Sequence, residues 1–502
     1  MKAFFKDLKE NASSFIKNSR GAAIFLIAVY LIALFPLFRA NFNYRDDGGR
    51  VLWAYDDWNN FGRVTSNTLS HIVHADKYLR DISPLTQIIA VLLIVAASLL
   101  LLKAVRGSKK LTVWDALCVL PLGLFPYFLC CFSYKYDAPY MALSVLVSVI
   151  PLVFRKRGWV YYLIAFVCSL LMCTTYQASA GIFPMLVIFT AFIDWKSGEK
   201  TGKVLRFCLF SALAFIAALL IFFLLIPKGD GEYVTTKMAM DLSSVKHIIS
   251  NYWTYIYTFK RDFRIHWFVV IALISAMFML WNILETDRNR ILTLLVGGVV
   301  YVLLFVFSFG PYPFLSEPFL MPRGMYGLGV FITFICLGAT QFHNAENKLK
   351  AIKATSLISV IALSWLCIVF TCTYGNALSA QKKYDEFRIE EVAVKLADLD
   401  LLNDEERTPI QVTGSIGYAS GIRNISGDRL LLRLVPPPFG GDNYWSYLKL
   451  LSYYGLPEME YTKELINDSD AGWQIVDENC YHTIYSDGER VIIELKGGDP
   501  GQ

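Results

Sequence analysis

A series of long apolar segments between residues 21 and 374 is the feature that most constrains the fold. A helix needs about 20 apolar residues to cross the hydrocarbon core of a bilayer, and about 17 can suffice. Eleven segments approach or exceed that length, near residues 21–38, 84–102, 114–133, 138–154, 158–175, 178–193, 204–226, 267–284, 291–309, 324–341 and 355–374. The sequence therefore predicts an α-helical polytopic membrane protein with about 11 transmembrane helices.

Composition supports this class and excludes others. Hydrophobic residues make up 55% of the chain and charged residues only 18%, against roughly 25% charged residues in ordinary globular domains. The net charge of +5 gives no electrostatic support for a nucleic-acid partner. Of the ten cysteines, only Cys480 lies outside the apolar segments, and there is no CxxC pair. We therefore expect neither a disulfide within the polar tail nor a zinc site.

Basic residues alternate between the connections of the predicted spans. Clusters of Lys and Arg lie in the N-terminus and in residues 103–110, 155–157, 196–206, 288–290 and 348–353, all on one face. The positive-inside rule makes that face cytoplasmic. The N-terminus, residues 1–20, is then cytoplasmic, residues 21–374 form the transmembrane domain, and an odd number of spans puts residues 375–502 outside the cell membrane. The long polar segments 39–83, 228–264 and 310–323 also fall on the outer side.

Residues 375–502 have the pattern of a soluble domain. Residues 384–401 have apolar positions at helical spacing, and PIQVTGSI at 409–416 is typical of a strand. NYWSYLKLLSYY at 443–454 favours a helix, and YHTIY and RVIIELK flank Asp487-Gly488, a hairpin turn signal. The sequence predicts a small extracytoplasmic α/β domain.

The first outer loop, residues 39–83, has the densest charge. It holds six carboxylates (Asp46, Asp47, Asp56, Asp57, Asp76, Asp81) and the basic residues Arg45, Arg50, Arg63, Lys77 and Arg80. Adjacent carboxylates just after a span can supply a base for a hydroxyl group while arginines hold an anion. The alternative is a solvated loop with local ion pairs. His71 and His74 with Asp76 fit a surface helix better than a metal site.

Three further outer segments have polar residues between spans. They are SYKYDAP at 133–139, with Lys135 and Asp137, TTYQAS at 174–179, with Tyr176 and Gln177, and the loop 310–324, which ends in Arg323. Each alone would be an ordinary hairpin connection. Their shared side of the membrane favours a functional interpretation.

These residues resemble a known family. The run YRDDGGRVLWAYDDW, then Gly62-Arg63 and Asp81-Ile82-Ser83-Pro84-Leu85, is similar to the bacterial polytopic glucosyltransferases typified by phage-encoded enzymes that add glucose branches to O-antigen. SYKYDAP, TYQAS and Pro322-Arg323 follow in the family's order, so the resemblance covers about residues 20–375. It implies the GT-C fold, in which the first outer loop carries acidic catalytic residues and lies on the membrane as short helices.

The resemblance also implies the substrates. The donor would be a polyprenyl-phosphate sugar, such as undecaprenyl phosphate glucose, used on the outer face of the bacterial plasma membrane, and the acceptor a cell-envelope polysaccharide or glycolipid. Glucose is the family's usual sugar, while N-acetylglucosamine or galactose would need only a few changes in a pocket. The identity of the sugar and of the acceptor stays open.

Asp46 and Asp47, eight and nine residues beyond the first predicted span, are the candidate catalytic pair. We favour Asp47 as the base, with Asp46 in support, in a single displacement that inverts the anomeric configuration. A monophosphate leaving group does not require a metal, so we expect no cofactor, with a divalent cation as the open alternative. The candidate substrate-binding residues are Arg50, Arg63, Lys135, Asp137, Tyr176, Gln177 and Arg323.

A flippase and a cell-envelope scaffold are the alternative functions. A flippase or exporter of lipid-linked glycan would have charged or Gly/Pro-broken spans in matching halves, which the sequence does not show. A cell-envelope scaffold would need no acidic pair.

In the tail, an aromatic-rich helix with Tyr444, Trp445, Tyr447, Tyr453 and Tyr454 follows Pro436-Pro437-Pro438. These rings would guide a polymeric acceptor or form the tail's own core.

Overall fold

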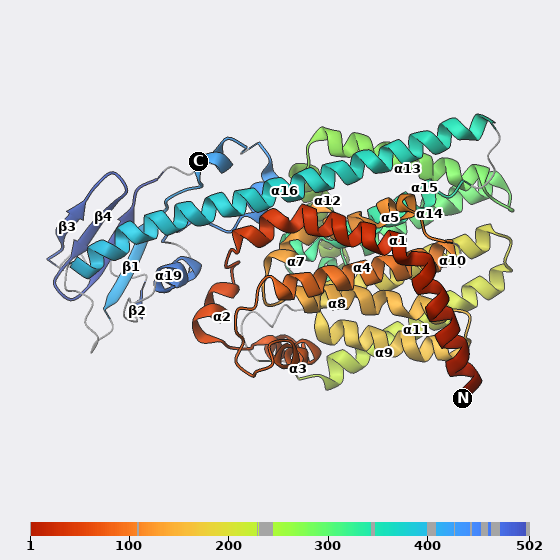
Figure 1. Ribbon diagram of the computed structural model, residues 1–502, viewed down its shortest axis with the longest axis horizontal. Helices are drawn as coiled ribbons and strands as arrows, with labels where there is room; N and C mark the ends of the chain where they lie inside the picture. Colours follow the sequence, from red (N-terminus) through yellow and green to blue (C-terminus); the bar gives the residue numbers. More distant parts are fainter. Residues whose placement is uncertain are drawn as a thin grey trace. The chain divides into compact units, whose positions relative to one another are not determined.

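The chain folds into helices and one small sheet (Figure 1). The computed structural model describes residues 2–107, 110–227, 229, 244–342, 347–398, 408–425, 427–441, 444–452, 460–462 and 472–497. Two compact units result. The membrane unit comprises residues 1–35, 56–77 and 82–372, and the tail unit comprises residues 36–55, 78–81 and 373–502.

Seven helices in the described part of the chain are long and apolar enough to cross a membrane. They lie in α1 (Lys2–Ala40), α4 (Leu85–Arg106), η4 with α10 (Gln177–Gly181 and Ile182–Lys196), α11 (Thr201–Leu225), α13 (Ile265–Leu284), α14 (Arg290–Phe307) and α16 (Asn347–Asp398). Several helices of the membrane unit run side by side (Figure 1), among them α4 with α8 (Ala138–Val149) and α9 (Trp159–Thr175) with α11. The prediction of a multi-pass membrane protein is confirmed.

The remaining predicted spans are helical but shorter or bent. Residues 113–133 form α5 (Val113–Val119), α6 (Pro121–Leu124), η2 (Pro126–Phe128) and α7 (Leu129–Ser133), with a bend of 50° that makes them at most one further span. Pro121 and Pro126 each begin a new piece because proline has no backbone N–H to continue a helix. Residues 138–154 (α8 and η3, Ile150–Phe154), α9 and α15 (Gly327–Ala339) are short apolar helices. The count of eleven spans stays a prediction.

Helix α11 shows why these helices need lipid around them. Leu205, Leu209, Leu213, Ile216 and Leu220 are between 49% and 63% exposed along one side of the helix. Such a stripe would be costly in water, because burying one large apolar side chain away from water is favourable by about 1.5–3 kcal/mol of free energy. In a bilayer the same stripe faces hydrocarbon. The exposed apolar surface therefore agrees with a membrane location.

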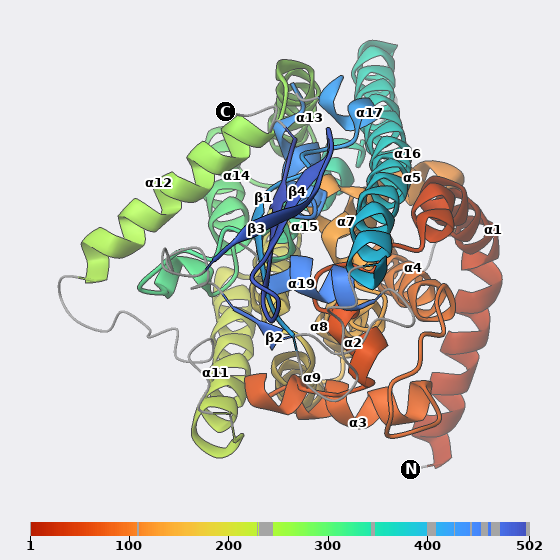
Figure 2. The ribbon, with the colours of Figure 1, turned by 90° about the vertical axis from the view of Figure 1, so that its left-hand side faces the viewer.

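Two helices in the polar connections lie at an angle to the membrane helices. Helices α3 (Val64–Val73) and α12 (Ser244–Asp262) run across the bundle (Figure 2), as helices that lie along a membrane surface would. The side chain of Asn251 in α12 donates to the carbonyls of Pro313 and Leu315, at 3.0 and 2.8 Å. These bonds fix the loop 310–324, which contains η5 (Tyr312–Phe314) and η6 (Pro322–Gly324).

The tail unit contains a five-stranded sheet of order β2-β1-β5-β4-β3 (Figure 2). Its strands are β1 (Pro409–Gly414), β2 (Glu460–Tyr461), β3 (Gln474–Glu478), β4 (His482–Ser486) and β5 (Val491–Leu495). Strand β1 is parallel to β2 and β5, and β5, β4 and β3 are antiparallel neighbours. Ile389, Val392 and Leu396 of α16 pack on Ile410 and Val412 of β1.

Short helices complete this unit: α17 (Ser420–Arg423), α18 (Arg429–Leu434) and α19 (Tyr444–Leu451). The predicted strand at 409–416, the hairpin around Asp487-Gly488 and the helix within 443–454 are confirmed. The rings of Tyr444, Trp445, Tyr447, Tyr453 and Tyr454 lie outside the described residues, so their predicted role stays untested.

The last predicted span and the first helix of the tail are one continuous helix, α16, of 52 residues. No proline interrupts this stretch of sequence. At its centre Gly375 lies against the end of α1, where a Cβ would collide with the backbone of Pro36 and Leu37. Glycine is required here for close approach of two helices and does not break the helix.

Native Cys480 offers a test of the predicted topology. It is exposed, whereas the other nine cysteines are buried or half-buried. We expect a membrane-impermeant maleimide added to intact cells to label the wild type at Cys480 and to leave Cys480→Ser unlabelled. In the Cys480→Ser background, Ser197→Cys, at the exposed basic end of α10, should react only after permeabilisation. The reverse pattern would place the tail in the cytoplasm.

Candidate functional site

The acidic stretch of the first outer loop belongs to the tail unit. The buried Tyr44 donates its phenolic O–H to the carbonyl oxygen of Leu434, at 2.7 Å, across 390 residues of sequence. Tyr374 donates to the same oxygen at 3.4 Å. We call these two phenols and the Leu434 carbonyl the tyrosine node. It attaches the start of the loop to the C-terminal end of α18 and to α16.

Asp46 and Asp47 begin α2 (Asp47–Trp53), directly after the tyrosine node. Asp47 is fully buried, and its Oδ2 accepts the backbone N–H of Tyr44 at 3.2 Å. Asp46, at the N-cap, is partly exposed. Arg45 between them and Tyr44 has φ = +51°, a left-handed conformation that is rare for a side chain of this kind. The two carboxylates therefore have different surroundings, and the turn that carries them is tightly constrained.

Arg50 follows one turn later in α2. It is only 2% exposed, and its backbone N–H donates to the carbonyl of Asp46 at 3.2 Å. Burying a guanidinium is costly unless it interacts with acceptors. The structure thus places the predicted Arg50 within the same short helix as the acidic pair. It is part of the tail unit and not of the membrane unit.

In the membrane unit, two predicted arginines converge on one tyrosine. The guanidinium carbon of Arg63 lies 4.7 Å from the ring centre of Tyr176. Its Nε donates to Oε1 of Gln177 at 3.1 Å, and the amide of Gln177 donates to the Phe61 carbonyl at 3.0 Å. The hydroxyl of Tyr176 donates to the carbonyl of Arg323 at 3.4 Å. We call Arg63, Arg323, Tyr176 and Gln177 the arginine cluster.

The arginine cluster includes further aromatic contacts that the sequence did not reveal. The guanidinium of Arg323 lies 4.7 Å from the ring centre of Tyr134. Burial raises the pKa of Tyr312 to about 12, and the charges of Arg63 and Arg323 oppose this rise. The Tyr312 phenol therefore stays neutral at physiological pH. A partial signal was present in SYKYDAP, where Tyr134 and Tyr136 flank Lys135.

Asp137 and Lys135 lie in the segment between α7 and α8, and both are buried, at 5% and 3% exposure. The Oδ1 of Asp137 accepts the indole N–H of Trp58 at 2.6 Å. This bond ties η1 (Trp58–Phe61) to the start of α8. Asp137 therefore positions the turn that precedes Arg63. Trp58 is a further residue that the sequence reasoning missed.

Other charged residues of the first outer loop form a local network. Asp56 Oδ2 accepts from the amide of Asn67 and contacts Nε2 of His71, both at 2.7 Å. His74 instead stacks on Tyr136, with 5.6 Å between ring centres. The two histidines therefore have different partners. Asp56 thus pairs with residues of its own loop, as the alternative of a loop with local ion pairs predicts.

Backbone packing brings the outer segments together in the membrane unit. A Cβ at Gly181, at the end of η4, would collide with the carbonyl of Phe307. A Cβ at Gly327, at the start of α15, would collide with the carbonyl of Ser308. Only glycine permits these contacts. They bring the TYQAS segment and the loop that carries Arg323 together.

The fold and these residues define a multi-pass membrane protein with basic and aromatic residues clustered between the ends of its helices. The sequence profile of the glucosyl transferase GtrII family matches residues 15–334, and the chain belongs to this family. The predicted resemblance is confirmed. The match ends before α16, so the family assignment rests on the membrane unit and the first outer loop.

A curated relative from Salmonella phage P22 aligns over nearly the whole chain. It is described as an uncharacterized 55.3 kDa protein in the gtrB 5′ region, and is 24% identical over 499 residues, with 96% of this chain and 99% of the relative aligned. The alignment therefore includes the tail. No solved structure matches the chain significantly.

Replacement of Arg323 by lysine tests the arginine cluster. Lysine keeps the charge but loses the planar fork of N–H donors and its stacking on Tyr134. We expect Arg323→Lys to lower the rate of glucosyl transfer by about 10²-fold or more, the usual effect of losing one preorganised donor. Arg261→Lys, at an exposed position at the end of α12, is the matched control. Near-normal donor affinity and turnover in Arg323→Lys would remove Arg323 from the site.

Proposed function

We propose that this protein transfers a hexose, glucose by its family, from a polyprenyl-phosphate donor to a cell-envelope glycan on the outer face of the membrane. The observation that carries the proposal is the arginine cluster, in which the Arg63 guanidinium lies over the ring of Tyr176 and the Tyr176 hydroxyl donates to the backbone carbonyl of Arg323. The acceptor would be a polysaccharide or a glycolipid. The GT-C architecture is part of the proposal.

A lipid-linked donor fits the location of the arginines. Its isoprenoid tail stays in the bilayer, so its phosphate and sugar lie at the membrane surface. Guanidinium groups match phosphate oxygens through two parallel N–H bonds. The partners of Arg63, namely the face of Tyr176 and the Gln177 amide, hold its guanidinium in place before the donor binds. The basic connections on the other face are short, which favours a lipid-linked donor over a soluble nucleotide sugar.

The acidic pair supplies the base in this proposal. As the acceptor oxygen forms a bond to the anomeric carbon, a carboxylate of Asp47 or Asp46 takes the hydroxyl proton. The bond from the anomeric carbon to the phosphate oxygen breaks, and the lipid phosphate leaves with the electron pair. Arginine side chains stabilise the charge that grows on the phosphate. One displacement of this kind inverts the anomeric configuration and needs no cofactor.

Substitution of the acidic pair tests the reaction and separates it from the flippase alternative. We expect Asp47→Asn to bind donor normally and to lower turnover by roughly 10²-fold or more, the usual contribution of a general base. The assay follows hexose transfer from a polyprenyl-phosphate hexose by the full-length protein in liposomes. Asp76→Asn, in the same loop, is the control.

Asp46→Asn and the double variant complete the test. A flippase would keep its activity in the double variant. Full transfer activity in both single variants would remove the pair from catalysis. Transfer by the wild type from a nucleotide sugar, and not from the lipid-linked hexose, would overturn the proposed donor.

A further inference from the structure

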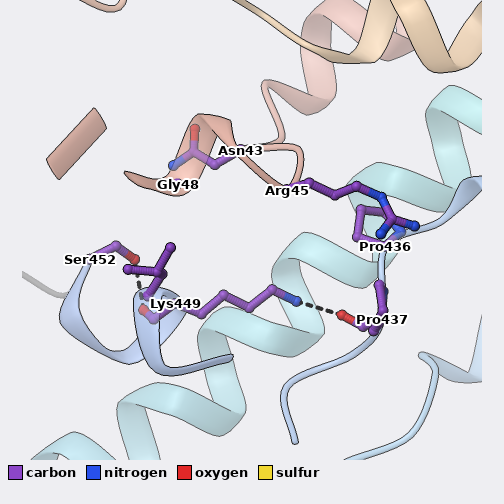
Figure 3. A pocket seen from close by; sticks show the side chains of 8 residues that line it. Asn43, Arg45, Gly48, Pro436, Pro437, Lys449 and Ser452 are labelled. Carbon is purple, nitrogen blue, oxygen red and sulfur yellow. Dashed lines mark hydrogen bonds between the residues drawn. The ribbon is translucent and has the colours of Figure 1, made fainter. Parts of the chain in front are cut away.

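A pocket in the tail unit lies between the first outer loop and the segments around α19 (Figure 3). Its lining comes from two parts of the sequence: Asn43, Arg45 and Gly48 from the loop, and Pro436, Pro437, Leu448, Lys449 and Ser452 from the C-terminal domain. The tyrosine node joins the same two parts. The pocket therefore exists only because the loop folds against the tail.

Hydrogen bonds hold the wall of the pocket in place. The ammonium of Lys449 donates to Asp385 Oδ2 at 2.6 Å and to the Pro437 carbonyl at 2.9 Å (Figure 3 shows the second bond). Ser452 donates to the Lys449 carbonyl at 2.7 Å. The Lys449 ammonium is thus anchored between α16 and the proline segment. The wall is largely formed before any ligand binds, which lowers the entropic cost of binding.

The lining chemistry suits a carbohydrate. Pro436, Pro437 and Leu448 offer apolar surface to the C–H groups of a sugar ring. Asn43, Arg45 and Ser452 offer amide, guanidinium and hydroxyl groups for its hydroxyls. Ligand sites commonly combine apolar walls with a few polar groups in this way. None of the described lining residues has a carboxylate, so the pocket also tolerates an acidic sugar.

The pocket lies beside the proposed base along the chain. Arg45 and Gly48 both line it, and Asp46 and Asp47 are the two residues between them. Gly48 adds no side chain at this point, and a Cβ there would have Leu448 as its nearest neighbour, at 3.9 Å. Neither carboxylate lines the pocket itself, but a sugar bound there would lie beside the turn that carries them.

We propose that this pocket binds a sugar of the acceptor glycan and presents it to the acidic pair. The inference rests on the proposed function and assigns the acceptor subsite to the tail unit. The donor's phosphate belongs elsewhere, to the arginine cluster. Substitutions in the pocket should then weaken the affinity for the acceptor and leave the affinity for the donor unchanged.

The test uses full-length protein and cell-envelope polysaccharide from a strain that lacks the gene, which carries unmodified acceptor. Ser452→Trp places a bulky ring at the pocket, and Asn43→Ala removes a polar group without adding volume. We expect each variant to weaken binding of this fluorescently labelled polysaccharide by about tenfold or more, measured by anisotropy without donor. Ser420→Trp, the same substitution at an exposed position of the tail unit, should bind as the wild type does.

Transfer kinetics give the second readout. Both pocket variants should raise the KM for the polysaccharide while the KM for the polyprenyl-phosphate hexose stays constant. Unchanged polysaccharide binding in both variants, or a raised KM for the donor alone, would overturn the inference while transfer by the wild type still supports the proposed function. Absence of transfer by the wild type would instead contradict the proposed function.

Discussion

The hydrogen bond from Tyr44 to the Leu434 carbonyl is the interaction on which the organisation of the tail unit depends. Tyr374 of α16 donates to the same oxygen. A buried carbonyl without a donor would cost about 1–3 kcal/mol, so the node favours one arrangement of loop and tail. That arrangement builds the turn of Asp46 and Asp47, the short helix α2 and the pocket beside them. The tail is therefore part of the proposed catalytic apparatus.

The groups for the proposed chemistry are divided between two folding units. The acidic pair and Arg50 belong to the tail unit, whereas Arg63, Tyr176, Gln177 and Arg323 belong to the membrane unit. This division matches the two proposed substrates. A lipid-linked donor requires groups at the ends of membrane helices, and a polymeric glycan requires a surface outside the bilayer.

Local sequence patterns predicted most elements but not their long-range contacts. Apolar length predicted the membrane helices, and the Asp487-Gly488 turn predicted the hairpin of β4 and β5, with Gly488 at φ = +101°. Charge, predicted side of the membrane and the family resemblance selected Arg63 and Arg323, while the contacts of both residues with Tyr176 needed the fold. The bond between Tyr44 and Leu434 has no local signal because the partner is a backbone carbonyl, which every residue has. The sequence did not predict that α16 is continuous, because the polar residues after the last apolar segment are typical of the end of a transmembrane helix.

Hydrogen–deuterium exchange in Tyr44→Phe tests most directly whether the tail folds the acidic loop. The substitution removes one buried hydrogen bond, with an expected cost of about 1 kcal/mol. Amides of Asp47–Trp53 in the full-length protein should then exchange about fivefold faster than in the wild type, if their opening follows the loop's local stability. Tyr485→Phe, which removes an exposed bond to Glu494, is the control and should leave α2 unchanged. Wild-type exchange of Asp47–Trp53 in Tyr44→Phe would contradict the account.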